Sequence, residues 1–187
     1  LSSILPFVKV VVLHGNGEPF FKKNIAQYLS EMSQYDIQFI ANTNLSIISD
    51  ELLVFFNNNF MELNISCDGH TKSLYESIRQ GLSYERFIKN IEVVRSKCPN
   101  LMMKMSVVVM RQNMKFLPEI VQFAKRMGFD EIILNQGIYY SLEGYLYPNT
   151  YEFKNKDVSV KEIFKTMLDE MDKKISPYKD DLLNSKY

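Results

Sequence analysis

The fold prediction for the whole chain starts from the stretch KVVVLHGNGEPFF, residues 9–21. Its apolar run, residues 10–13, is typical of a strand that is covered on both faces in a parallel sheet. Gly15 and Gly17 then break the run, because glycine allows a positive φ and a close approach of the backbone to a ligand. Glu18 lies at the end of this turn, and Pro19 fixes the chain just before the next helix. The stretch therefore predicts a buried strand followed by a glycine-lined acidic turn.

Composition indicates one globular domain and gives no sign of a nucleic-acid or membrane partner. The chain has 187 residues, of which 46% are hydrophobic, and Lys plus Arg balance Asp plus Glu at 22 each. Cys67 and Cys98 have no neighbouring His or Cys, so neither a disulfide framework nor a zinc site is indicated. No apolar run approaches the roughly 20 residues of a membrane span. We expect a reduced, cytoplasmic protein.

Strand and helix patterns alternate along the chain. Strands are predicted at residues 10–13, 37–43, 60–66, 101–110 and 131–135. Helices are predicted at 24–32, 49–56, 83–98 and 118–127, with Pro99-Asn100 ending the third of them. The absence of hairpin signals between these strands predicts parallel βα units with right-handed crossovers, so the fold class is α/β. Beyond Gln136 the pattern predicts a long loop, residues 137–157, and an amphipathic helix, residues 160–175.

The residues that follow the predicted strands are polar, and ligand sites of parallel α/β folds lie at the carboxyl ends of the strands. No His accompanies a Ser or Cys, and His14 and His70 share no metal-ligand spacing. This rim suits the binding of a small polar molecule. Asp68 can serve either as part of a turn with Gly69 or as a general base, and the sequence leaves both readings open.

The order of four motifs resembles the radical S-adenosylmethionine superfamily over roughly residues 7–137. These are GNGEP after the first strand, Asn42-Thr43-Asn44 after the second, ISCDG with a downstream arginine after the third, and a strand that ends near Asn113. The resemblance implies a partial (β/α) TIM-like barrel in which the family's first strand is missing. Residues 1–137 would form the core barrel, and residues 138–187 a loop and helix that belong to the same domain or link it to a further region.

The resemblance also implies two cofactors, S-adenosylmethionine and a [4Fe-4S] cluster. The turn at Gly15 to Glu18 would meet the amino group of the cofactor, Ser66 its ribose or carboxylate, Arg79 its carboxylate, and Asn113 its ribose. Backbone around Leu134 would hold adenine. The full set of expected cofactor-binding residues is Gly15, Asn16, Gly17, Glu18, Asn44, Ser66, Asp68, Arg79, Asn113, Leu134 and Gln136.

The sequence departs from the family pattern in one respect that bears on activity. The family binds its cluster through a CxxxCxxC loop, which Cys67 and Cys98 cannot supply. We therefore expect a fragment of a radical S-adenosylmethionine enzyme that is inactive alone. The complete enzyme would form a 5′-deoxyadenosyl radical and abstract hydrogen from an unidentified small molecule or peptide.

An alternative function remains open at this stage. A degenerate barrel could bind a nucleoside-like ligand or a protein partner without chemistry. A CxxxCxxC motif upstream of Leu1 would favour the enzyme, whereas an initiating Met there would favour the binding module. In either case an open sheet edge beside Val10 predicts self-association.

Overall fold

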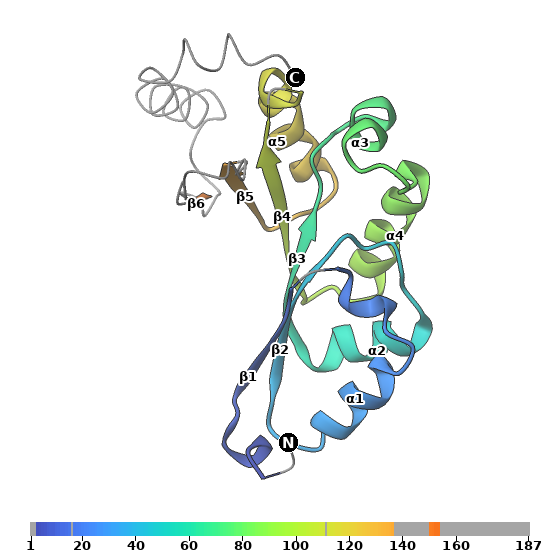
Figure 1. Cartoon of the computed structure of the whole chain (residues 1–187), viewed down its shortest axis with the longest axis vertical. Coiled ribbons are helices and arrows are strands. Elements are labelled where there is room, and N and C mark those ends of the chain that lie inside the picture. The colour runs from blue at the N-terminus through green and yellow to red at the C-terminus, as the bar shows by residue number, and fades with distance from the viewer. Residues whose placement is uncertain (1–2, 16, 111, 137–149, 154–187) are drawn as a thin grey trace, which may run out of the picture. The chain divides into compact units, whose positions relative to one another are not determined.

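Strands β1 to β6 form one sheet in which each strand pairs with the next along the chain (Figure 1). The computed structural model describes residues 3–15, 17–110, 112–136 and 150–153, all within one unit, Leu1–Lys154. Five strands are parallel: β1 (Val10–Leu13), β2 (Gln38–Thr43), β3 (Phe60–Ser66), β4 (Met102–Val109) and β5 (Glu131–Gln136). Strand β6 (Thr150–Phe153) pairs antiparallel with β5. The described residues thus form an open α/β sheet of the kind found in partial TIM-like barrels.

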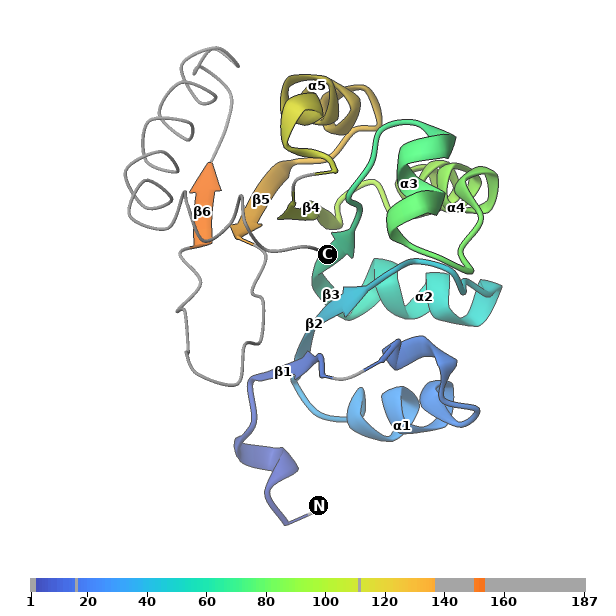
Figure 2. The same cartoon turned by 45° about the horizontal axis from the view of Figure 1, so that its top comes forward.

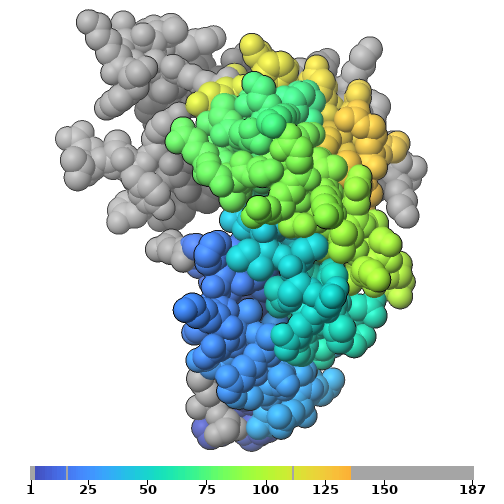
Figure 3. All heavy atoms as spheres, turned by 90° about the vertical axis from the view of Figure 1, so that its right-hand side faces the viewer, coloured from blue at the N-terminus to red at the C-terminus, as the bar shows by residue number. Residues whose placement is uncertain are grey.

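The helices that connect the parallel strands lie on one face of the sheet (Figure 2). They are α1 (Ile25–Met32), α2 (Asp50–Asn58), α3 (Lys72–Ile78), α4 (Tyr84–Lys97) and α5 (Leu117–Arg126), with short 3-10 turns η1 (Leu5–Phe7), η2 (Pro19–Phe21) and η3 (Met114–Phe116). Right-handed crossovers between sequentially ordered parallel strands place every helix on the same side. Figure 3 shows this helix layer, whose colours follow the chain from blue to yellow along the sheet.

The hydrophobic core fills the space between the sheet and these helices. Alternate residues of the central strands are fully buried there, including Leu63 and Ile65 of β3 and Met103 and Met105 of β4. Successive side chains of a strand point to opposite faces, so the residues between them face the other side of the sheet. That second face, which we call the inner face, carries polar side chains and is important for the site described below.

Most elements predicted from the sequence are confirmed. All five parallel strands occur within one or two residues of their predicted bounds, as do four of the five helices. Two caps explain this agreement. Ser49 and Ser83 accept hydrogen bonds from the Leu52 and Arg86 amides, which begins α2 and α4 where the sequence indicated. Gly128 ends α5 with a φ of 74°.

The structure differs from the predictions at three elements. Val10 and Val12 are 46% and 50% exposed, so β1 is not covered on both faces by the described residues. The segment before Ser83 contains α3, which the sequence pattern missed. The predicted loop at 137–157 includes β6, whose sequence TYEF is rich in strand-forming residues.

Two predictions lie outside the described residues or remain untested. The helix predicted at 160–175 falls outside the described ranges, and the domain boundary at residue 137 stays a prediction. In the described part of the chain, no helix has the length and apolarity that a membrane span requires.

Candidate functional site

The residues predicted to bind a cofactor gather at the carboxyl ends of the parallel strands. This edge carries Gly15 and Gly17 after β1, Asn44 after β2, Ser66 and Asp68 at the end of β3, Asn113 after β4, and Leu134 within β5. Arg79 is the C-cap residue of α3 and joins the edge through an ion pair with Asp68. Asn16 and the side chain of Gln136 lie outside the described parts of the structure.

Glu18 ties the glycine turn after β1 to the end of β2. Its Oε1 accepts a hydrogen bond from Thr43 Oγ1 and its Oε2 accepts one from the Asn44 amide, both at 2.7 Å. The turn has positive φ values at Gly15 and Gly17, 144° and 111°, and glycine adopts such values more readily than other residues. Oε1 also accepts from the Phe20 amide at 3.4 Å, so the further acceptor capacity of the carboxylate lies on Oε2. Glu18 therefore shapes the rim and keeps acceptor capacity for a cationic ligand group.

The loop after β2 is held by buried polar contacts that the sequence reading missed. Thr43 Oγ1 accepts from the Leu45 amide at 2.9 Å, and Leu45 has a left-handed φ of 54°. Asn90, from α4, donates to the Leu45 carbonyl at 2.8 Å. Asn90 occupies a buried position among apolar residues of α4, and such a polar residue on an apolar face is the signal that could have identified it.

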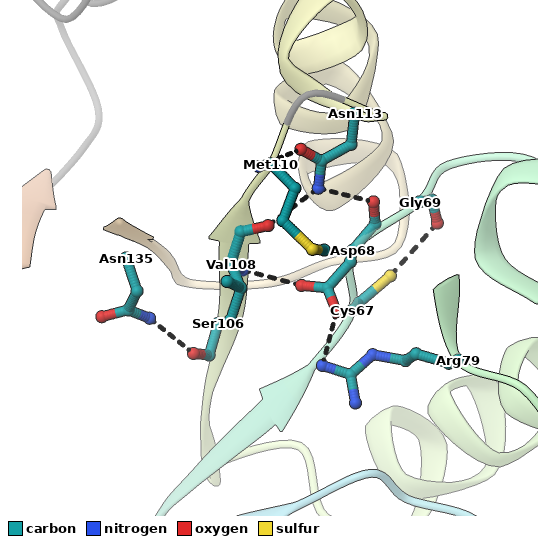
Figure 4. A network of polar contacts seen from close by, with 9 residues as sticks. All are labelled: Cys67, Asp68, Gly69, Arg79, Ser106, Val108, Met110, Asn113 and Asn135. Carbon is teal, nitrogen blue, oxygen red and sulfur yellow. Dashed lines mark hydrogen bonds and ion pairs between the residues drawn. The ribbon is translucent and has the colours of Figure 1, made fainter. Parts of the chain in front are cut away.

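A second set of hydrogen bonds connects the carboxyl ends of β3 and β4 (Figure 4). Asp68 Oδ1 accepts from the Val108 amide at 2.7 Å, and Asn113 Nδ2 donates to the Asp68 carbonyl at 3.0 Å and the Val108 carbonyl at 2.8 Å. Asn113 Oδ1 accepts from the Met110 amide at 2.7 Å. Asn113 is fully buried, so it supports the strand ends. Its contact with a ribose stays a prediction.

Arg79 pairs with Asp68 at the same place. The Arg79 Nη2 to Asp68 Oδ2 distance is 2.8 Å, and the two side chains are 19% and 5% exposed. Burial raises the pKa of Asp68, while the Arg79 guanidinium and the Val108 amide act to lower it. Among the described residues, the buried Arg79 Nε has no hydrogen-bond partner.

Polar side chains continue from the rim down the inner face of the sheet. Ser66 lies opposite Ser106 in the ladder of β3 and β4, and Asn135 Nδ2 donates to Ser106 Oγ at 2.9 Å (Figure 4). Asn135 is one of the polar residues that the sequence places at the end of the fifth strand, whereas Ser106 was not identified from the sequence. The alternation of polar and apolar residues in β3 and β4, typical of strands with one polar face, was the available signal.

Three charged residues lie further down this inner face. Lys104 Nζ is 2.8 Å from Glu62 Oε2 and 3.1 Å from Glu131 Oε2, with all three side chains less than 20% exposed. These ion pairs link β3, β4 and β5. Burial acts to lower the pKa of Lys104, but its hydrogen bonds to both carboxylates outweigh burial and hold the pKa above its usual value.

The cysteines of the chain do not fit the thiolate ligand set of an iron-sulfur cluster. Cys67 and Cys98 are both buried, and their Sγ atoms donate to the Gly69 and Leu53 carbonyls at 3.3 and 3.5 Å. Burial raises the pKa of Cys67 to about 12, which disfavours the thiolate. No cluster of three or more His, Cys, Asp or Glu residues suited to a metal occurs among the described residues.

Comparison with known proteins gives the class of fold. No protein-family model matches the chain. The chain is similar to Streptococcus suis SuiB, with a TM-score of 0.59 and 16% identity over 89% of this chain and 36% of SuiB. It is likewise similar to anSMEcpe solved with bound AdoMet and a peptide, with a TM-score of 0.59 and 18% identity over 75% of this chain and 41% of that one. These neighbours are radical S-adenosylmethionine enzymes, and the chain has the partial barrel fold of that superfamily.

Two sequence relatives add to this picture. A GTP 3',8-cyclase of Synechocystis sp. (strain ATCC 27184 / PCC 6803 / Kazusa), also a radical S-adenosylmethionine enzyme, is 25% identical over 112 residues, which are 59% of this chain and 34% of the cyclase. An endolytic murein transglycosylase of Bacillus subtilis (strain 168) is 35% identical over 54 residues, which are 29% of this chain and 15% of that protein. The chain thus spans about a third or less of the curated relatives that it matches.

Proposed function

We propose that the rim at the carboxyl ends of β1 to β5 binds S-adenosylmethionine, as the cofactor-binding core of a radical S-adenosylmethionine enzyme. The observation that carries this proposal is the gathering of the predicted residues at one edge of a sheet with that superfamily's fold. One structural neighbour, SuiB, is known in a complex with S-adenosylmethionine. The radical chemistry, and the peptide or small molecule on which it acts, belong to this proposal for the complete protein.

The chemistry of the rim matches the two ends of the methionyl group. The carboxylate would meet the Ser66 hydroxyl and the Arg79 guanidinium, because a planar guanidinium suits a carboxylate. The ammonium group would lie at the turn between Gly15 and Glu18, where backbone carbonyls and a carboxylate accept hydrogen bonds. Asn44 and Asp68 support these contacts from the neighbouring strand ends.

The nucleoside would extend toward β4 and β5. We assign the ribose to the region of Asn113 and the adenine to backbone of Leu134 and Gln136, on the opposite side of the rim from the glycine turn. Backbone N–H and C=O groups at a strand end can recognise the edge of a base without a charged side chain. This placement follows the strand order β1 to β5 across the sheet.

The two cysteines do not fit the cluster that the reaction needs, so no catalytic step is assigned to residues of this chain. When bound, the cluster would supply the electron that cleaves S-adenosylmethionine in this class of enzyme, and the buried Cys67 and Cys98 do not suit it as thiolate ligands. We infer that the 187-residue chain binds the cofactor weakly and does not cleave it.

Calorimetry of the 187-residue chain with S-adenosylmethionine tests the proposal. We expect weak, saturable binding by the wild type and about tenfold weaker binding by Ser66→Ala, the loss of one hydrogen bond to a charged group. Ser73→Ala, on the exposed surface of α3, is the matched control and should bind like the wild type. Identical titrations of wild type and Ser66→Ala, or no saturable heat from either, would contradict the assignment.

A further inference from the structure

Asp68 uses its two carboxylate oxygens for different partners. Oδ1 accepts the Val108 amide of β4, and Oδ2 pairs with Arg79 at the end of α3, so one buried side chain joins two strands and a helix (Figure 4). A DG sequence after a strand is usually explained by turn conformation alone. Here the carboxylate itself is 5% exposed and fixes the position of a guanidinium at the rim.

Arg79 has donor capacity that the described residues do not use. A guanidinium carries five N–H donors in a planar fork. The ion pair with Asp68 engages Nη2, while Nε is buried and has no partner among the described residues. Because the Arg79 side chain is 19% exposed, an acceptor that arrives with a ligand can meet the part of the guanidinium that the ion pair with Asp68 leaves open. One side of the guanidinium is therefore fixed by Asp68, while its remaining N–H donors are available to a ligand.

We propose that Asp68 is a positioning residue for Arg79, and that it orients the guanidinium toward the carboxylate of the bound cofactor. This inference rests on the proposed binding of S-adenosylmethionine and adds the residue that sets its carboxylate preference. Arg79 ends a seven-residue helix and has a long flexible side chain. A fixed partner reduces the conformational entropy that Arg79 loses on binding a ligand.

Two other roles for Asp68 predict different results. If Asp68 only connects β3 to β4, its replacement lowers the affinity of the site for every ligand equally. If Asp68 competes with the ligand for Arg79, its replacement strengthens binding. A positioning role alone predicts a loss that is confined to ligands carrying the carboxylate. Asp68→Asn separates these cases, because the amide oxygen can still accept the Val108 amide while the negative charge is lost.

The experiment compares S-adenosylmethionine with its decarboxylated analogue, which lacks only the carboxylate, by calorimetry on the 187-residue chain. The wild type should prefer S-adenosylmethionine. Asp68→Asn should lose about tenfold affinity for S-adenosylmethionine and none for the analogue, and Arg79→Gln should show the same pattern. The double variant should be no weaker than Arg79→Gln. Asp36→Asn, which alters an exposed ion pair with Lys9, is the control and should match the wild type.

Each outcome separates this inference from the proposed function. If the wild type binds neither ligand, both proposals fail. If Arg79→Gln abolishes the preference for the carboxylate but Asp68→Asn keeps it, the inference fails and the proposed function stands. Equal losses for both ligands, or tighter binding by Asp68→Asn, also overturn the positioning role. Should Asp68→Asn fail to fold, Asp68→Glu keeps the charge, moves it by one methylene, and should lower only the affinity for S-adenosylmethionine.

Discussion

At the scale of single residues, the ISCDG motif shows how much of a site can depend on a few neighbouring positions. Ser66 faces the polar inner side of the sheet, Cys67 lies in the core, and Asp68 holds Arg79 and Val108. Gly69 is required because an added Cβ would meet the Tyr75 backbone nitrogen of α3 at 2.6 Å. Adjacent residues at one strand end therefore face different surroundings, and the proposed binding and positioning roles fall to Ser66 and Asp68 separately.

Removal of Arg79 should strengthen the dependence of folding stability on pH. Burial already raises the pKa of Asp68 above its usual 3.8, and loss of the guanidinium raises it further. A raised pKa in the folded state means that stability is present at low pH and lost as pH rises through that pKa. Urea unfolding of Arg79→Gln should therefore show a deficit relative to the wild type that is small near pH 4 and grows to about 3 kcal/mol at neutral pH.

The control for this measurement is Lys9→Gln, whose partner Asp36 is exposed. That variant should lose little stability at any pH, because exposed ion pairs contribute little. A deficit of Arg79→Gln that is the same at pH 4 and pH 8 would show that Asp68 is not an ionised, buried partner of Arg79.

At the scale of elements, the inner face of the sheet is organised by charges that cross strand boundaries. Lys104 on β4 reaches Glu62 on β3 and Glu131 on β5, so one cation links three parallel strands. Because the group carries two carboxylates and one ammonium, its formal charge is negative. Loss of the cation would leave two poorly hydrated carboxylates on neighbouring strands.

Lys104→Ala should destabilise the fold by about 2 kcal/mol, since it leaves two carboxylates without their partner. Lys72→Ala is the matched control: its ion pair with Glu85 has a 2.6 Å separation, but both side chains are about 60% exposed. Thermal or urea unfolding should show a clear loss for Lys104→Ala and almost none for Lys72→Ala. Equal effects of the two substitutions would show that the inner-face charges are well hydrated.

The sequence predicted the elements whose signals are local and did not predict those that depend on tertiary contacts. Ser49, Ser83 and Gly128 marked helix ends correctly because caps act within a few residues. Helix α3 was missed because it has seven residues and a single buried side chain, Tyr75, and so lacks a clear amphipathic pattern. Its packing against Gly69 supplies what the local sequence does not.

The candidate site was predictable to the same degree. Polar residues after strands identified Glu18, Ser66 and Asp68 as rim residues, since parallel strands bring their ends together. Their partners could not be identified in this way. Asn90 and Val108 contribute through contacts between segments distant in the sequence, and no spacing rule encodes such contacts.

At the scale of the whole molecule, the sheet has an edge at β1. Among the described residues β1 pairs only with β2, and Val10 and Val12 are about half exposed. An exposed apolar edge strand can pair with another chain. The inner face and this edge are adjacent, so whatever covers the edge also borders the proposed binding rim.

We predict that the 187-residue chain self-associates through β1 in a concentration-dependent manner. Light scattering should give a mass that rises with concentration, and Val12→Lys should reduce this rise, because a charge on an edge strand opposes pairing. Val54→Lys, at an exposed position on α2, is the control and should associate like the wild type. A strict monomer at all concentrations would exclude association through this edge.

The most direct test of the proposed cofactor site is a titration of the ¹⁵N-labelled chain with S-adenosylmethionine, followed by amide chemical shifts. The binding rim predicts saturable shifts at Gly15, Gly17, Ser66 and Leu134, which come from three different strands and their turns. The same titration of Ser66→Ala should require a higher ligand concentration. Shifts confined to the helix face of the sheet, or no shifts at the rim at millimolar ligand, would contradict the cofactor site.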